Sequence, residues 1–130
     1  MYLIDTNIFL EILLEQDNAD KCTEFFENAA KQQTTCLVTS YTLHSIETIL
    51  SNLKRFPVLI AFLEDLLDNQ WIRHYHTTPE EELLVIRSMS EIGLDFDDAL
   101  QYHIAKKFNA TIVTYDRHFK KISDLNIVAP

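Results

Sequence analysis

Short apolar runs rich in β-branched residues alternate with longer amphipathic stretches along this chain, and this alternation constrains its fold most strongly. Alternating strands and helices are typical of a parallel sheet covered by helices on both faces. We therefore predict an α/β fold, a single-domain three-layer sandwich over residues 1–130 with a parallel sheet of four to five strands flanked by helices. The predicted strands are "MYLID", "TTCLVT", "WIRHYH", "ATIVT" and, at an edge, "NIVAP".

The stretches between these runs have apolar residues at helical spacing. The fifth stretch opens with a capping box, in which Thr78 caps the helix, Pro79 takes its first position and Glu81 its third. We expect Ser40 to cap the third helix, and "YDRHFKKI" to form a turn or a short helix. Helices are predicted over residues 7–15, 17–33, 40–54, 57–69, 78–93 and 95–108.

Glycine and cysteine usage exclude several classes of protein. Gly93 is the only glycine, so the chain has neither a glycine-rich phosphate loop nor a dinucleotide-binding fingerprint. Cys22 and Cys36 lack the spacing of metal ligands. There is no apolar run long enough to cross a membrane and no signal-peptide pattern. These features predict a reduced, cytoplasmic protein without a membrane partner.

The net charge of −9 limits how this protein can contact nucleic acid. A protein that binds mainly by covering phosphates with lysine and arginine is expected to be basic. Nucleic acid is therefore either no partner, or it is held by a local basic patch together with bound cations. The acidic surface also suits a basic protein partner.

Acidic residues stand where the predicted strands end and where one helix begins. Asp5 ends the first strand, and Asp116 follows "ATIVT" after one intervening residue. The segment "LDFDDALQ" places Asp95, Asp97 and Asp98 at the start of a helix. Glu47 lies two turns into the third predicted helix, on the flank of its apolar stripe. Because parallel sheets bind ligands at the carboxyl ends of their strands, we expect these four sequence-distant acidic groups to converge on one rim.

Each acid also has an ordinary structural interpretation. Asp95 as a helix cap, with Asp97 and Asp98 in the first turn, is favoured by the helix dipole alone. Asp116 alone is typical of a turn. Asp5 differs because it ends a buried strand and no basic residue lies near it in the sequence. A buried carboxylate needs a partner, which a bound cation would provide.

The ligand chemistry indicates which cation this would be. Clusters of carboxylate oxygens favour Mg²⁺ or Mn²⁺, whereas zinc prefers histidine and cysteine. His74 and His76 share a face of one predicted strand and offer an alternative, a transition-metal site.

Three segments together resemble the PIN domain family. They are "LIDTNIFLEIL", Glu47 in the third predicted helix, and "DFDDALQYHIAKKFNATIVTYDRHF". The resemblance covers nearly the whole chain and implies a metal-dependent endoribonuclease that uses Mg²⁺ or Mn²⁺. Small single-domain members, the VapC-type toxins, form toxin–antitoxin pairs, so the resemblance also implies a cognate antitoxin as partner.

The resemblance assigns roles to individual residues. The four catalytic acids would be Asp5, Glu47, Asp98 and Asp116, of which Asp5, Asp98 and Asp116 would bind the metal together with Asp97. Glu47 would bind the metal directly or orient the attacking water. Many relatives carry a further acid where this chain has His118, which leaves one- and two-metal sites open. Accessory or substrate-contacting residues would be Thr6, Asn7, Thr114, Arg117, His118 and Lys120.

Several alternatives stay open at this stage. A catalytically inactive PIN-like module that binds protein or RNA has the same pattern of residues. Lys106, Lys107, Arg117, Lys120 and Lys121 are near the acids in sequence and either contact an RNA backbone or simply solvate the surface. The apolar helix "PVLIAFLEDLL" either forms a homodimer interface or belongs to the core.

Overall fold

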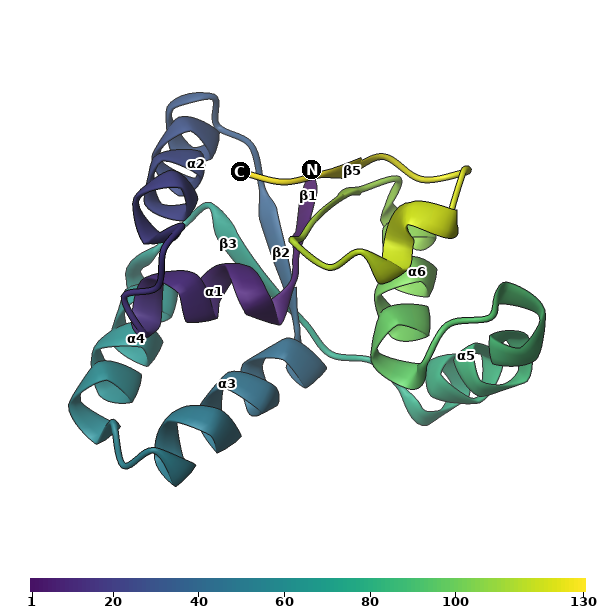
Figure 1. Ribbon diagram of the computed structural model, residues 1–130, viewed down its shortest axis with the longest axis horizontal. Helices are drawn as coiled ribbons and strands as arrows, with labels where there is room; N and C mark the ends of the chain where they lie inside the picture. Colours follow the sequence, from purple (N-terminus) through teal and green to yellow (C-terminus); the bar gives the residue numbers. More distant parts are fainter.

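The computed structural model describes residues 1–130 and confirms the α/β sandwich. A five-stranded sheet in the order β3-β2-β1-β4-β5, parallel throughout, lies between two layers of helices (Figure 1). None of the helices is both long and apolar enough to cross a membrane. The strands are β1 (Tyr2–Ile4), β2 (Cys36–Thr39), β3 (Ile72–Tyr75), β4 (Thr111–Val113) and β5 (Ile127–Val128).

Six α-helices and one short 3₁₀ helix, η1, connect the strands. Helices α1 to α4 cover one face of the sheet, and α5, α6 and η1 cover the other (Figure 1). The segment "YDRHFKKI" contains η1, and "NIVAP" forms the edge strand β5, both as expected. The helices are α1 (Thr6–Leu13), α2 (Ala19–Lys31), α3 (Ser40–Asn52), α4 (Phe56–Asp68), α5 (Pro79–Ile92), α6 (Phe96–Phe108) and η1 (His118–Lys121).

Alternation along the central strands divides the core into two halves. Leu3 and Ile112 face the α5–α6 layer, whereas the next residues, Ile4 and Val113, face the α1–α4 layer. All four are fully buried. Because successive strand residues point to opposite faces, short apolar runs without polar interruptions are what a strand buried on both faces requires.

The capping of two helices differs from the sequence expectations. Thr39, not Ser40, caps α3, because the hydroxyl of Thr39 accepts a hydrogen bond of 3.1 Å from the Thr42 amide. Asp95 occupies the cap position of α6, but its side chain makes no capping hydrogen bond. The capping box of α5 is present as predicted.

Candidate metal centre

A polar cavity of about 250 Å³ lies where β1 and β4 end and where α1, α3 and α6 begin or pass. It has room for an ion with a few waters, since each water takes roughly 30 Å³ of liquid volume. The parallel strands bring these sequence-distant segments to one edge of the sheet. The lining residues are Asp5, Thr6, Asn7, Leu10, Tyr41, Ser45, Asp97, Asp98, Gln101 and Asp116.

Asp5 stands at the base of this cavity and is only 8% exposed. Its oxygen Oδ1 accepts hydrogen bonds from the Thr6 amide at 2.7 Å and from Gln101 Nε2 at 2.6 Å. Its oxygen Oδ2 accepts from Asn7 Nδ2 and from Thr114 Oγ1, both at 2.6 Å. A carboxylate has about four acceptor sites. The cost of burying Asp5 is therefore offset by neutral donors of the protein itself, in addition to any cation.

Thr114 links the end of β4 to both acids at this edge. Its hydroxyl donates to Asp5 and accepts hydrogen bonds from Asn7 Nδ2 at 3.0 Å and from the Asp116 amide at 2.9 Å. Asn7 Oδ1 in turn accepts from the Tyr115 amide at 3.2 Å. This network fixes the chain that carries Asp116 relative to the end of β1. Asn7 and Thr114 thus lie where the resemblance placed accessory groups.

Asp98 and Asp116 meet beside His118. Asp98 lies in the first turn of α6 and is 5% exposed, whereas Asp116 is at the mouth of the cavity. His118 Nδ1 lies 3.1 Å from Asp98 Oδ2 and 3.3 Å from Asp116 Oδ1. These three residues form the only group of three or more His, Cys, Asp or Glu side chains whose ligand atoms lie within 4.8 Å of one another. His74 and His76 have rings 4.2 Å apart but lack a third ligand at that range.

The electrostatics of the cavity favour a cation. Burial, followed by repulsion from Asp97 and Asp116, raises the pKa of Asp98 to about 6, against the opposing effect of His118. Burial also raises the pKa of Asp5, although the hydrogen bonds from Thr114, Gln101 and Thr6 oppose it. The partners that these carboxylates have in the protein do not offset the cost of burial and repulsion, and a divalent ion would supply the missing positive charge.

Glu47 does not line the cavity. Ser45, one turn after Tyr41 on α3, faces the acids instead. Two positions along an α-helix correspond to a rotation of about 200°, so Ser45 and Glu47 cannot share a face. Glu47 lies on the other side of α3, near His74. Burial lowers the pKa of His74, and the charge of Glu47 partly opposes that decrease. The geometry thus offers no support for Glu47 as a metal ligand.

Gln101 is a buried member of the site that is absent from the residues predicted from the sequence. It lies one turn after Asp98 on α6 and is 4% exposed. Its Nε2 donates to Asp5, which fixes the amide orientation, and its Oε1 is buried with no hydrogen-bond partner in the protein. A polar residue three positions after a candidate ligand, on a helix whose remaining inward residues are apolar, was the available signal.

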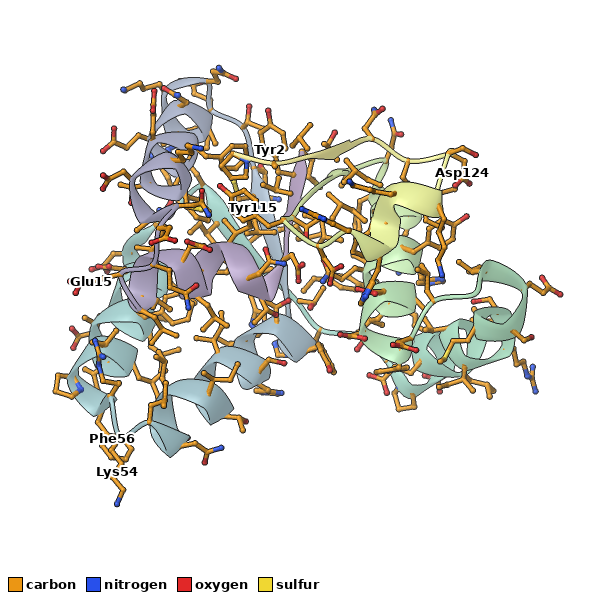
Figure 2. All side chains as sticks on the ribbon, viewed as in Figure 1. Tyr2, Glu15, Lys54, Phe56, Tyr115 and Asp124 are labelled. Atoms are coloured by element: carbon orange, nitrogen blue, oxygen red, sulfur yellow. The ribbon has the colours of Figure 1, made fainter.

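The basic residues near the site divide into two groups. Lys106 pairs with Asp124 at 2.9 Å, Lys107 with Glu81, and Lys121 with the Gly93 carbonyl. Asp124 lies at the upper right of the molecule, in the segment between η1 and β5 (Figure 2). Arg117 and Lys120 make no ion pair and line a hollow of about 570 Å³ that also contains Asp116.

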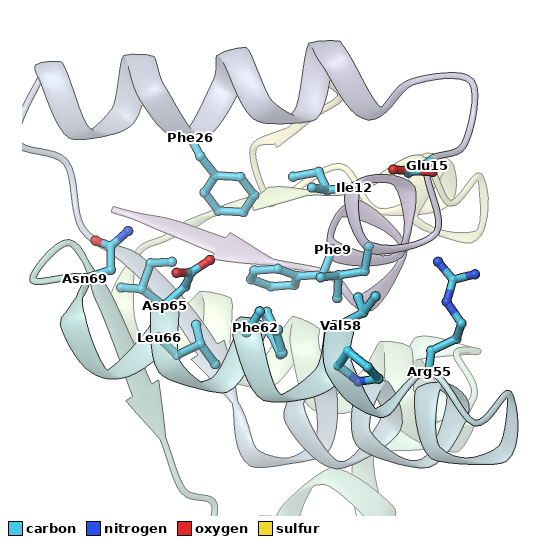
Figure 3. Close-up of a pocket in the computed structure, with 14 residues that line it drawn as sticks. Phe9, Ile12, Glu15, Phe26, Arg55, Val58, Phe62, Asp65, Leu66 and Asn69 are labelled. Atoms are coloured by element: carbon cyan, nitrogen blue, oxygen red, sulfur yellow. The ribbon is translucent and has the colours of Figure 1, made fainter.

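A third, mainly apolar groove of about 530 Å³ lies between α1, α2 and α4 (Figure 3). Phe9, Phe26 and Phe62 form its floor, with the Phe9 and Phe62 rings 5.4 Å apart. Glu15, Arg55 and Asp65 stand around its rim (Figure 3). The α4 helix also leaves Ile60 and Leu67 exposed, so it is only partly a core helix.

The residues of the polar cavity fit a divalent cation by their donor chemistry. They offer carboxylate oxygens and one unpaired amide oxygen, and the neighbouring His118 adds an imidazole nitrogen. Asp97 is exposed and lines the cavity, where it adds negative charge, whereas Asp95 does not line it.

Solved structures share this fold at low sequence identity. The toxin–antitoxin complex VapBC2 from Rickettsia felis, bound to a promoter DNA fragment, contains a chain 21% identical with a TM-score of 0.74, and the match covers 98% of this chain and 97% of that one. VapC20 from Mycobacterium tuberculosis, a toxin that cleaves the sarcin–ricin loop, is 14% identical with a TM-score of 0.75, covering 92% and 93%. A toxin–antitoxin complex from Klebsiella pneumoniae contains a chain that is 15% identical with a TM-score of 0.72, and the match covers 98% of this chain and 96% of that one.

At these identities the structural likeness establishes the fold alone. A search of curated proteins finds no match. The PIN domain family model, however, matches residues 2–125, which is nearly the whole chain. The chain therefore belongs to the PIN domain family.

Proposed function

We propose that this protein is a metal-dependent endoribonuclease that hydrolyses RNA phosphodiester bonds. The observation that carries the proposal is the convergence of Asp5, Asp98 and Asp116, from three distant segments, on one polar cavity at the carboxyl ends of the strands. Membership of the PIN family, and the sarcin–ricin loop as the target of a protein of the same fold, support an RNA substrate.

The cofactor in this proposal is Mg²⁺ or Mn²⁺. Asp98 and Asp116 would hold the ion, with Asp5 behind them and Asp97 adding charge at the rim. Such an ion lowers the pKa of a bound water and stabilises negative charge on a phosphate oxygen. Glu47 has no part in this version of the site because Ser45 occupies the face that turns toward the acids.

The protein's own groups would position the reactants. Hydrogen bonds of Thr114 and Asn7 fix the position of Asp5 relative to the segment that carries Asp116. Gln101 Oε1 is an acceptor without a partner beside Asp5, and it suits a water that must be oriented. No side chain of the cavity is a strong nucleophile, so water is the attacking group.

RNA would approach the cavity from the side that carries basic side chains without ion-pair partners. Arg117 and Lys120 lie beside Asp116 without ion-pair partners, whereas the neighbouring lysines 106, 107 and 121 are engaged. Local positive charge of this kind offsets the net charge of −9 for a polyanionic substrate.

A protein partner of the antitoxin class belongs to the same proposal. The apolar groove between α1, α2 and α4 offers a docking surface for an apolar segment with basic flanks, given the carboxylates of Glu15 and Asp65 on its rim (Figure 3). Solved chains of the same fold occur in toxin–antitoxin complexes. Binding of an apolar peptide with basic flanks to the wild type would support such a partner, and loss of that binding in Val58→Asp would place the peptide in this groove. A homodimer through α4 would compete for the same helix and stays a prediction.

An inactive binding module is the second candidate. Two observations favour it, the serine at position 45 on the cavity wall and the hydrogen bonds that already occupy both oxygens of Asp5. The two functions differ in one measurable property, which is cleavage.

The deciding experiment is cleavage of a mixed RNA substrate with EDTA, Mg²⁺ or Mn²⁺ by the wild type and by Asp116→Asn. Asp116 is preferable to Asp5 because the amide nitrogen of an asparagine at position 5 would face two of the four donors that now bind Asp5. Asp116 Oδ1 accepts a hydrogen bond from the His118 amide and lies 3.3 Å from the His118 imidazole. Metal-dependent cleavage that Asp116→Asn loses while keeping its fold would support the nuclease. RNA binding without cleavage under all three conditions would favour the inactive module.

A further inference from the structure

His118 brings a nitrogen atom into a cluster of carboxylates. It begins η1, and its amide donates a hydrogen bond of 2.8 Å to Asp116 Oδ1. The next residue, Phe119, is fully buried in the core and anchors the turn. The imidazole is consequently held beside Asp98 and Asp116, although most of its surface is exposed.

The spacing of the three groups suits ligands of one ion. An octahedral ion with ligands at about 2.1 Å separates adjacent ligand atoms by roughly 3.0 Å. His118 Nδ1 lies 3.1 Å from Asp98 Oδ2 and 3.3 Å from Asp116 Oδ1. The ligand atoms of the three residues all lie within 4.8 Å of one another, a span over which they can share one ion.

A separate observation concerns Gln101, which lines this cavity. Gln101 Oε1 is buried and unpartnered in a side chain that is 4% exposed, and its amide orientation is fixed by the bond to Asp5. A buried acceptor without a donor costs about 1–3 kcal/mol. A water carried by a bound ion would be a suitable donor.

The ligand set determines which ion binds best. An all-oxygen site suits Mg²⁺, which demands oxygen ligands and keeps its waters, whereas imidazole suits first-row transition ions. We propose that His118 is a nitrogen ligand that makes this site select Mn²⁺ or Co²⁺ over Mg²⁺. The inference rests on the metal site of the proposed function, but not on RNA cleavage.

The experiment compares ion binding in the absence of RNA. Titration calorimetry with Mn²⁺ and with Mg²⁺ would give the ratio of dissociation constants for the wild type, His118→Asp and His118→Ala. His44→Asp is the matched control, since it adds the same charge at an exposed histidine of α3 and also reports any ion held near His74. Pulsed electron paramagnetic resonance of bound Mn²⁺ would detect coupling to an imidazole nitrogen.

We expect the wild type to prefer Mn²⁺, and we expect His118→Asp to reduce that preference by about tenfold or more, with loss of the nitrogen coupling. His44→Asp should change neither property. An unchanged ratio and coupling in both His118 variants would overturn the inference even if the protein cleaves RNA. A changed ratio in a protein that cuts no RNA would support the inference while the nuclease proposal fails.

Discussion

Gln101 Nε2 donates a hydrogen bond of 2.6 Å to Oδ1 of Asp5, and so ties the middle of α6 to the end of β1. The same amide leaves its oxygen buried and unpaired. One side chain therefore supports an acid of the site and presents an unused acceptor beside it. A buried oxygen without a partner lowers the stability of the fold, so stability alone does not account for Gln101. The arrangement instead favours a role in positioning Asp5 and a group bound beside it.

Replacing Gln101 with methionine should separate these two contributions. The lost hydrogen bond to a carboxylate costs about 1.5–3 kcal/mol, and removing the unpaired acceptor returns about 1–3 kcal/mol, so the melting temperature should change little. Cleavage should fall, and the acidic limb of its pH profile should move to higher pH, because the bond from Gln101 lowers the pKa of Asp5. Gln70→Met, at an exposed position, is the control. A large loss of stability with an unchanged pH profile would leave Gln101 a structural residue.

The sequence was sufficient for the architecture and for the acids at strand ends. Asp5 and Asp116 follow apolar runs, and the rule that parallel strands end at one edge places them together. The sequence was insufficient to show which face of α3 turns toward the acids, because Ser45 and Glu47 differ only in their position around the helix. The cap of α3 was also predicted one residue too late, at Ser40 instead of the observed Thr39. Gln101 was not predicted because an unpaired buried oxygen is a property of the packed structure.

The structure favours Ser45 over Glu47 as the α3 residue of the site, and two substitutions test this. Glu47→Gln should retain cleavage and metal binding, because Glu47 faces away from the cavity toward His74. Ser45→Leu should reduce both, since it would place an apolar side chain on the polar wall. Circular dichroism would check that both variants fold. Loss of metal binding in Glu47→Gln alone would show that α3 turns its other face to the ion.

Asp98 should make the metal-free protein less stable as the pH rises. Its pKa is about 6 in the folded protein, above the ordinary value of 3.8, so the folded state holds more protons than the unfolded state between these values. Stability is then highest below pH 4 for this group and falls as the pH rises through 6. Asp98→Asn mimics the protonated acid and should be more stable than the wild type at pH 7 in EDTA, by on the order of 2–3 kcal/mol.

Thermal unfolding at pH 4 and pH 7 would measure this effect. The difference between Asp98→Asn and the wild type should shrink at pH 4, and Mn²⁺ should raise the melting temperature of the wild type far more than that of the variant. A difference that is the same at both pH values would mean that Asp98 is not destabilised by its charge.

Reversing the charges of Arg117 and Lys120 should weaken RNA binding. The Arg117→Glu, Lys120→Glu double variant removes the free cations beside Asp116, and the dependence of affinity on salt should also decrease, because fewer phosphate contacts release fewer ions. Fluorescence anisotropy with single-stranded RNA at two salt concentrations would measure both. The control is Lys31→Glu with Lys54→Glu, which changes the net charge equally at exposed positions, Lys54 being at the far end of the molecule (Figure 2). Equal losses in both double variants would assign the effect to net charge.

Glu81 should stabilise the attachment of α5 to the sheet at neutral pH, and acid should remove this stabilisation. Burial raises the pKa of Glu81, but hydrogen bonds from Lys107, Tyr75 and the Thr78 amide outweigh it and lower the pKa to about 2, from an ordinary 4.5. The stabilisation is therefore complete above pH 4.5 and is lost as the pH falls toward 2. Glu81→Gln keeps the capping box but not the charge, and should cost about 1 kcal/mol at pH 7 and little near pH 2.

Glu81→Ala provides the comparison, because it removes the reciprocal bond of the capping box as well. It should remain less stable than Glu81→Gln at every pH, since the lost hydrogen bond from the Thr78 amide contributes about 0.5–1.5 kcal/mol whether or not the glutamate is ionised. Urea unfolding of the three proteins between pH 2 and pH 7 would separate the two contributions. If the stability curve of Glu81→Gln ran parallel to that of the wild type across this range, the ion pair with Lys107 would contribute nothing, and the capping box alone would hold the start of α5.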